Sequence, residues 1–176
     1  KEKDLTLTDH KDFKDKIYEA IDFLEGLEKE YVSIKSFDGL KLNGFYINNN
    51  SDTTVLLVHG YRSMPFNAFN MAAKRLYEDG YNLLFIEQRA HGSSEGVYTS
   101  FGLLERKDVK SWCEFINEKY ASKNIVLYGS SMGCASVEMA LELDMPNNIK
   151  AAILDCGFCD VFKLVKSECR KRNPFN

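Results

Sequence analysis

The chain has 176 residues, close to the size of one domain, and carries 23 Lys and Arg against 26 Asp and Glu, a formal net charge of −3. Hydrophobic residues make up 44% of it and aromatic residues 12%, a composition that excludes a disordered chain. The charge balance does not indicate a basic surface for binding nucleic acid or an anionic membrane. No apolar run approaches the ~18 residues of a membrane span.

The first residues predict an amphipathic helix. Within 11–29, Phe13, Ile17, Ile21 and Leu24 recur at helical spacing among acids and lysines. We expect residues 1–30 to form a helical segment on the outside of the molecule and residues 31–176 to form its core.

The hydrophobic period then changes to that of strands. Tyr31–Phe37 and Leu40–Ile47 read as two strands, and the Asp38-Gly39 dipeptide between them is typical of a hairpin. Four later runs are short and apolar throughout, which is the pattern of strands covered on both faces in a parallel sheet. These runs are 54–58, 81–86, 125–128 and 151–154.

Helical segments separate the apolar runs. They are expected at Phe66–Asp79, closed by Gly80, at Leu103–Tyr120 and at Met132–Leu143. Strand and helix alternate after the opening hairpin, so the predicted fold is α/β, a three-layer αβα sandwich around an open, mostly parallel sheet.

The strongest chemical signal is the sequence GSSMG at 129–133, a G-x-S-x-G pattern. A buried strand precedes it and a helix rich in small residues follows, so Ser131 is expected on a sharp turn at the carboxyl edge of the sheet, where open α/β sheets bind ligands. The pattern predicts Ser131 as a nucleophile, and the competing reading is a glycine-flanked turn with an incidental serine.

Two backbone N–H groups are candidates for an oxyanion hole. The start of a helix leaves N–H groups unpaired, which favours the N–H of Met132. His59-Gly60-Tyr61 follows another buried strand, and the N–H of Tyr61 is the second candidate.

With these motifs the chain resembles the α/β-hydrolases and is similar to the bacterial group related to serine aminopeptidases and acyl-thioesterase-like hydrolases. The resemblance rests on the His59-Gly60 turn, the Arg89-x-His91-Gly92-x-Ser94 loop and the GSSMG turn, in that order over about residues 30–160. Relatives usually carry Asp-x-Arg where this chain has Glu87-Gln88-Arg89. We interpret Glu87 as a longer acid in the same structural role.

The resemblance also implies an acid after a seventh strand and a catalytic histidine after an eighth. Here Ala151–Leu154 is the sixth predicted strand, and the three histidines, His10, His59 and His91, all precede Ser131. The resemblance assigns His59 and His91 to shaping loops, although either could act as base, since triad chemistry depends on geometry and not on chain order. We expect a chain truncated after the sixth strand, with base and acid missing and the 176-residue stretch inactive on its own.

The predicted function is a serine hydrolase, of carboxylesterase or peptidase type, that acts on a small acyl substrate without a cofactor or metal. Cys156 and Cys159 form a C-x-x-C pair, yet only Cys169 is a further nearby thiol, too few for a four-ligand zinc site. Asp155 ends the sixth strand, where some lipases place their acid, but a structural role is preferred. The alternative function is a non-catalytic module that binds a small ligand or a protein partner.

Two expectations concern the surroundings of the protein. A sixth strand that lacks the seventh and eighth strands beside it would leave an open sheet edge, through which the chain could form a homo-oligomer.

The five cysteines are sparse and odd in number, unlike a secreted disulfide framework, and no export signal is recognised. These features favour a cytoplasmic location, and a membrane or export segment upstream of residue 1 is the alternative.

Overall fold

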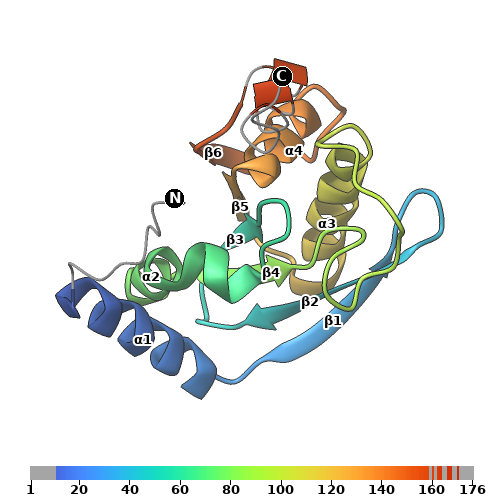
Figure 1. Cartoon of the computed structure of the whole chain (residues 1–176). Helices are drawn as coiled ribbons and strands as arrows, with labels where there is room; N and C mark the ends of the chain where they lie inside the picture. Colours follow the sequence, from blue (N-terminus) through green and yellow to red (C-terminus); the bar gives the residue numbers. More distant parts are fainter. Residues whose placement is uncertain (1–10, 159, 161, 164–165, 168–169, 171–176) are drawn as a thin grey trace.

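The computed structural model describes residues 11–158, 160, 162–163, 166–167 and 170. Within residues 11–158, four helices and six strands follow one another (Figure 1). They are α1 Lys11–Gly26, β1 Glu30–Lys35, β2 Lys41–Ile47, β3 Thr53–Val58, α2 Pro65–Glu78, β4 Asn82–Ile86, α3 Glu105–Tyr120, β5 Asn124–Ser130, α4 Met132–Ala140 and β6 Ile149–Asp155.

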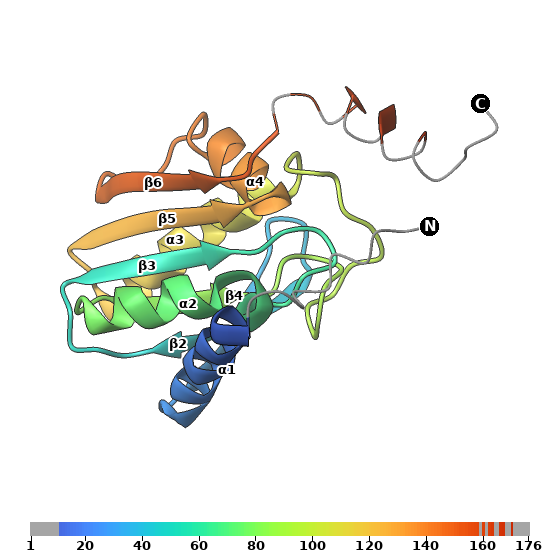
Figure 2. The same cartoon turned by 60° about the vertical axis from the view of Figure 1, so that its left-hand side comes forward.

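The strands form one mixed sheet in the order β1-β2-β4-β3-β5-β6. Strands β4, β3, β5 and β6 are parallel to one another, whereas β2 is antiparallel to both β1 and β4. The arrowheads of β3, β5 and β6 therefore point to the same edge, where their following loops gather (Figure 2). The α/β class and the mostly parallel sheet predicted from the sequence are confirmed.

The opening hairpin has a longer turn than the Asp38-Gly39 dipeptide suggests. Lys35 pairs with Lys41, so five residues connect the strands. The Ser36 hydroxyl accepts the N–H of Leu40 at 2.8 Å and donates to Asp38 at 2.6 Å, which holds the wider turn. Gly39 takes a φ of +93°, the conformation for which glycine is suited.

Two hydrophobic cores lie on the two faces of the sheet. Helices α1 and α2 cover one face, where Leu24, Phe69 and Phe85 are buried together. Helices α3 and α4 cover the other, with Trp112 and Val137 among its buried residues. Ile17 and Ile21 of α1 are half-buried beside the buried Leu24, as the helical spacing predicts, while the side chain of Phe13 lies outside the described residues.

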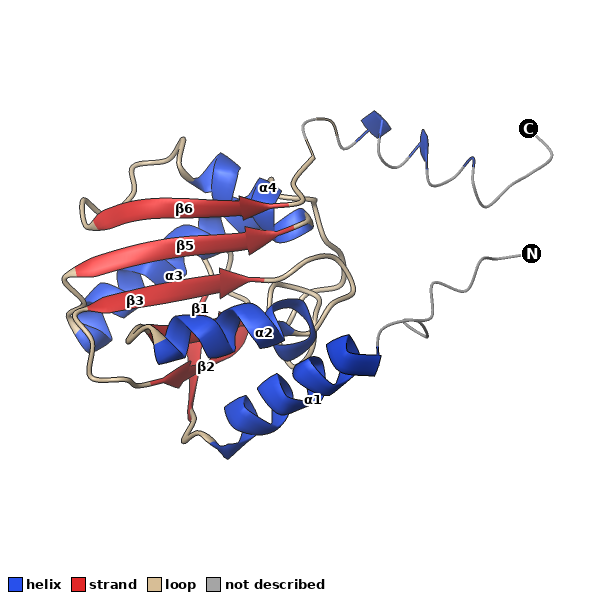
Figure 3. Ribbon diagram, turned by 90° about the vertical axis from the view of Figure 1, so that its left-hand side faces the viewer, coloured by secondary structure: helices blue, strands red, loops and turns tan. Residues whose placement is uncertain are grey.

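Strand β6 departs from the expectation that the parallel strands are buried on both faces. Ile153 and Leu154 are 40% and 45% exposed. The reason is that β6 pairs only with β5 in the described sheet, so both of its faces lie at the sheet margin, and no described helix lies over β6 on the α1 and α2 face (Figure 3). The open edge that the sequence predicted is thus present in the described part of the chain.

The remaining differences are small. Helix α4 ends at Ala140, because Leu143 N–H bonds to the Ala140 carbonyl in a turn that closes the helix ahead of Pro146. None of the helices in the described residues combines the length and apolar character that crossing a membrane requires.

Candidate active site

Ser131 lies at the turn between β5 and α4, at the carboxyl edge of the sheet. Its φ of 52° and ψ of −113° are sparsely populated for a residue with a Cβ, and such strain clusters at functional sites. Its side chain is exposed, and its N–H donates to the Asp155 carbonyl at 2.8 Å. The main chain of Asp155 therefore supports the turn from the neighbouring strand.

The two glycines of the GSSMG sequence allow α4 to approach the sheet. A Cβ on Gly129 would lie 2.4 Å from the Gly133 carbonyl oxygen, and a Cβ on Gly133 would lie 1.8 Å from that of Val58. Neither contact leaves room for a side chain. The glycine spacing thus reflects packing of the helix start against β3 and β5.

The turn after β3 lies next to Ser131. A Cβ on Gly60 would be 3.1 Å from the Ser131 Cβ and 3.6 Å from its Oγ. The Gly60 carbonyl accepts the N–H of Ser63 at 3.3 Å, which makes residues 60–63 a turn with Tyr61 at its first corner. Arg62, at the second corner, has a φ of 56°.

The N–H groups of Tyr61 and Met132 belong to the two segments that flank Ser131. Among the hydrogen bonds between described residues outside helices and strands, neither N–H is a donor. Met132 is the first residue of α4, where N–H groups have no partner within the helix. Neither group therefore has a backbone acceptor among the described residues.

His59 is buried and both of its ring nitrogens have partners. Nε2 accepts the N–H of Gln88 at 3.1 Å, so Nδ1 carries the proton that it donates to the Gly60 carbonyl at 2.7 Å. Burial lowers the pKa of His59 to about 4, which keeps the ring neutral at ordinary pH.

His91 is bound in a similar way. Nε2 accepts the N–H of Arg62 at 2.9 Å, and Nδ1 lies 2.9 Å from the Arg89 carbonyl. The two histidine rings meet edge to face at 4.9 Å. All four ring nitrogens of His59 and His91 therefore have partners in the loops that these histidines hold together. His10 lies outside the described residues.

Glu87 closes the loop that follows it, in keeping with the structural role expected from the sequence. Its Oε2 accepts both the N–H and the hydroxyl of Ser93, each at 2.7 Å. A Cβ on Gly92 would stand 2.5 Å from the Glu87 carboxyl carbon, so glycine is needed there for the carboxylate to reach Ser93.

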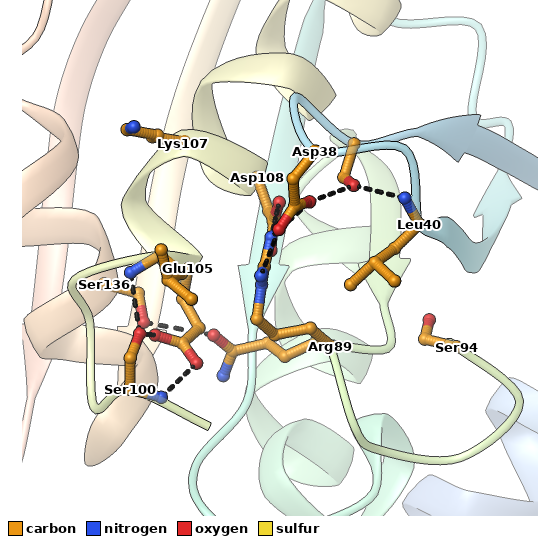
Figure 4. Close-up of polar contacts among 12 residues, drawn as sticks. Asp38, Leu40, Arg89, Ser94, Ser100, Glu105, Lys107, Asp108 and Ser136 are labelled. Atoms are coloured by element: carbon orange, nitrogen blue, oxygen red, sulfur yellow. Dashed lines mark hydrogen bonds and ion pairs between the residues drawn. The ribbon is translucent and has the colours of Figure 1, made fainter. Parts of the chain in front are cut away.

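Arg89 forms an ion-pair cluster that no local sequence pattern marks (Figure 4). Its guanidinium donates to Asp108 of α3 at 2.6 and 2.8 Å and to Asp38 of the hairpin turn at 3.0 and 3.1 Å. Burial alone would lower the pKa of Arg89, but the two carboxylates raise it. The hydrogen bonds from Arg89 and Ser36 hold the pKa of Asp38 at about 2. This cluster anchors the β4–α3 loop to two distant segments.

A cleft of about 790 Å³ lies at the opposite edge of the sheet from Ser131. Tyr46 and Tyr120 stack there with ring centroids 3.8 Å apart. The Tyr120 hydroxyl donates to Glu30, which also pairs with Lys119. This cleft borders the amino end of β4 and the carboxyl end of α3, so it belongs to a different part of the fold from the serine turn.

The described cysteines do not gather into a site. Cys113 and Cys134 are buried, and Cys156 is exposed at the end of β6. Cys159 and Cys169 lie outside the described residues, so the C-x-x-C pair is not tested by the structure. Within the described stretch, no three His, Cys, Asp or Glu side chains group as metal ligands would.

Comparison with known proteins adds a family match. Residues 49–171 match the family described as Hydrolase_4, serine aminopeptidase, S33. The uncharacterized protein YqkD of Bacillus subtilis is 24% identical over 144 residues, which are 80% of this chain and 47% of YqkD. YfhR of Salmonella typhimurium, also uncharacterized, is 30% identical over 145 residues, 75% of this chain and 43% of YfhR.

Solved structures of esterases share the fold. The esterase Pf2001 of Pyrococcus furiosus superposes with a TM-score of 0.74 at 32% identity, over 85% of this chain and 58% of the esterase. The esterase EaEST of Exiguobacterium antarcticum gives 0.58 at 20% identity, over 81% and 56%, a likeness of fold alone. The chain spans about half the length of the curated relatives that it matches.

Proposed function

The chain belongs to the serine aminopeptidase, S33 family of hydrolases, and on that premise we propose that it carries the nucleophile of a serine hydrolase. The substrate is a small acyl compound, an ester, a thioester or an amide. An ester is favoured by the likeness to the Pyrococcus furiosus esterase. The observation that carries the proposal is the strained, exposed turn of Ser131 between β5 and α4.

The reaction follows from what surrounds the hydroxyl. As a base takes its proton, Ser131 Oγ forms a bond to the substrate carbonyl carbon, and negative charge moves to the carbonyl oxygen. The N–H groups of Tyr61 and Met132 stabilise that charge. The intermediate collapses, the leaving group departs with the proton, and water then cleaves the acyl group from Ser131.

We propose that the base and the acid of this mechanism come from polypeptide outside this 176-residue stretch. His59 and His91 are engaged in loop hydrogen bonds, and no histidine follows Ser131 in this stretch. A serine hydroxyl without a base is a weak nucleophile, so the 176 residues alone are expected to be inactive.

The open β6 edge is proposed to be the point at which the sheet continues. Relatives are about twice as long, and the exposed Ile153 and Leu154 are apolar residues that a further layer would cover. In the isolated stretch, the same edge is proposed to pair with a second copy.

Labelling with a fluorophosphonate tests the central proposal. The protein expressed from its native reading frame should be labelled at one serine, and Ser131→Ala should abolish both labelling and hydrolysis of a p-nitrophenyl ester. Ser130→Ala, the neighbouring serine of the same motif, is the matched control and should keep both. An unlabelled wild-type protein would refute the proposal and favour the non-catalytic binding module.

A further inference from the structure

The side chain of Gln88 connects the two segments that flank Ser131. Gln88 lies just beyond β4 and is 3% exposed. Its Nε2 donates to the His59 carbonyl in the turn after β3, and its Oε1 accepts the Ser136 hydroxyl of α4 at 3.1 Å. His59 and Ser136 are both fully buried, so the bridge is closed off from water.

The main chain of Gln88, beside this side-chain bridge, acts on the peptide unit that carries the Tyr61 N–H. The main-chain N–H of Gln88 bonds to Nε2 of His59, which places the ring proton on Nδ1 and directs it at the Gly60 carbonyl. The Gly60 carbonyl and the Tyr61 N–H belong to one planar peptide group. Holding the carbonyl therefore fixes the direction in which the Tyr61 N–H points.

The Oε1 end of the side-chain bridge acts on the first turn of α4. The Ser136 hydroxyl that bonds Gln88 also lies 3.0 Å from the Met132 carbonyl, one helical turn earlier. Through its two amide atoms, Gln88 thus ties the turn that bears Tyr61 to the helix start that bears Met132.

We propose that Gln88 is a positioning residue that sets the direction of the Tyr61 N–H and its spacing from the Met132 N–H around the substrate oxygen. This inference rests on the proposed function. Gln88 touches no reacting atom and acts through His59 and Ser136. An oxyanion hole stabilises charge only when its donors are already in place, so loosening the bridge should slow the chemical step more than it weakens substrate binding.

If Gln88 had a merely structural role, its replacement would lower the stability of the protein without a specific loss of kcat. The chain offers a matched control for this case. Thr54 and Ser122 form another buried hydrogen bond of 2.8 Å at the opposite end of β3. Removing that bond with Thr54→Val costs stability in the same core but leaves the serine turn untouched.

The experiment compares Gln88→Met with Thr54→Val in the protein expressed from its native reading frame. Both should lower the unfolding midpoint, but only Gln88→Met should lower kcat for a p-nitrophenyl ester, by about 10–100-fold, with KM within about twofold. Ser136→Ala, which frees one end of the bridge, should cause a smaller loss of kcat. An unchanged kcat in Gln88→Met, or an equal loss in Thr54→Val, would overturn the inference.

A second variant keeps the inference testable if Gln88→Met does not fold. In Gln88→Glu the ionised carboxylate cannot donate to the His59 carbonyl, whereas the protonated acid can. The ratio of wild-type to variant kcat should therefore fall as the pH is lowered, and a flat ratio would contradict a positioning role. A wild-type protein that Ser131→Ala does not silence would refute the proposed function itself, a result distinct from a normal kcat in the Gln88 variants.

Discussion

Gly133 approaches Val58 so closely that a Cβ at position 133 would lie 1.8 Å from the Val58 carbonyl oxygen. At this point the backbone at the start of α4 lies directly against the backbone at the end of β3. No side-chain rotation can relieve it. The position of the helix that follows Ser131 therefore depends on the absence of a side chain at residue 133.

Gly133→Ala is predicted to destabilise the protein by about 3 kcal/mol or more, because α4 must move away from the sheet. Gly26→Ala is the control, since a Cβ at Gly26 has no neighbour within 4 Å. Urea unfolding should show a large fall in midpoint for the first variant and a change within about 0.5 kcal/mol for the second. Equal midpoints would show that the close approach is not maintained in solution.

The backbone strain at Ser131 predicts that glycine is more stable than alanine there. Glycine adopts a φ of 52° at low cost, so Ser131→Gly should exceed Ser131→Ala in unfolding free energy by about 1 kcal/mol. At Ser111, inside α3, the order should reverse by a similar amount, because glycine is a poor helix former. Thermal unfolding of the four variants measures both differences, and the same order at both positions would argue against strain at the turn.

The arginine cluster makes Arg89→Lys a severe substitution. A lysine cannot reproduce the planar fork that binds Asp108 through two nitrogens, and Asp108 would stay buried without full pairing. We expect a loss of about 2–3 kcal/mol in unfolding free energy. Arg75→Lys, at an exposed pair with Asp79, should change it by less than about 0.5 kcal/mol. Chemical denaturation tests both, and two equally mild effects would contradict a stabilising cluster.

These cases show what the sequence could predict and where it could not. The serine turn was predictable because strand, glycines and helix are adjacent in the chain and their pattern is local. Arg89 lies 51 residues from Asp38 and 19 from Asp108, so no local pattern marks their contact. The hydrogen bonds of the four ring nitrogens of His59 and His91 likewise could not be predicted from the sequence, because their partners come from loops that only the folded sheet brings together.

The buried His59 predicts that acid destabilises the fold. Its folded pKa of about 4 lies below the ordinary value of 6.5 because burial disfavours the charged ring. The unfolded chain therefore binds the proton more readily. The contribution of this pKa difference to the unfolding free energy is fully present above pH 6.5. About 3 kcal/mol of it is lost as the pH falls towards 4. In His59→Gln this part of the pH dependence should be absent. Urea midpoints between pH 4 and 7 measure it, and parallel curves for the two proteins would refute it.

The β6 edge predicts self-association of the isolated 176-residue stretch. An open strand with apolar side chains presents unpaired backbone groups that a second copy can bond, and a charged residue on such an edge opposes this pairing. Ile153 is 40% exposed on β6, so Ile153→Lys should shift the stretch from dimers or larger species towards the monomer. Val97 is 92% exposed in the loop between β4 and α3, away from the edge, and Val97→Lys should leave the distribution unchanged. Light scattering after gel filtration separates these outcomes. If the unmodified stretch stays monomeric at the highest concentration measured, the edge does not pair with a second copy.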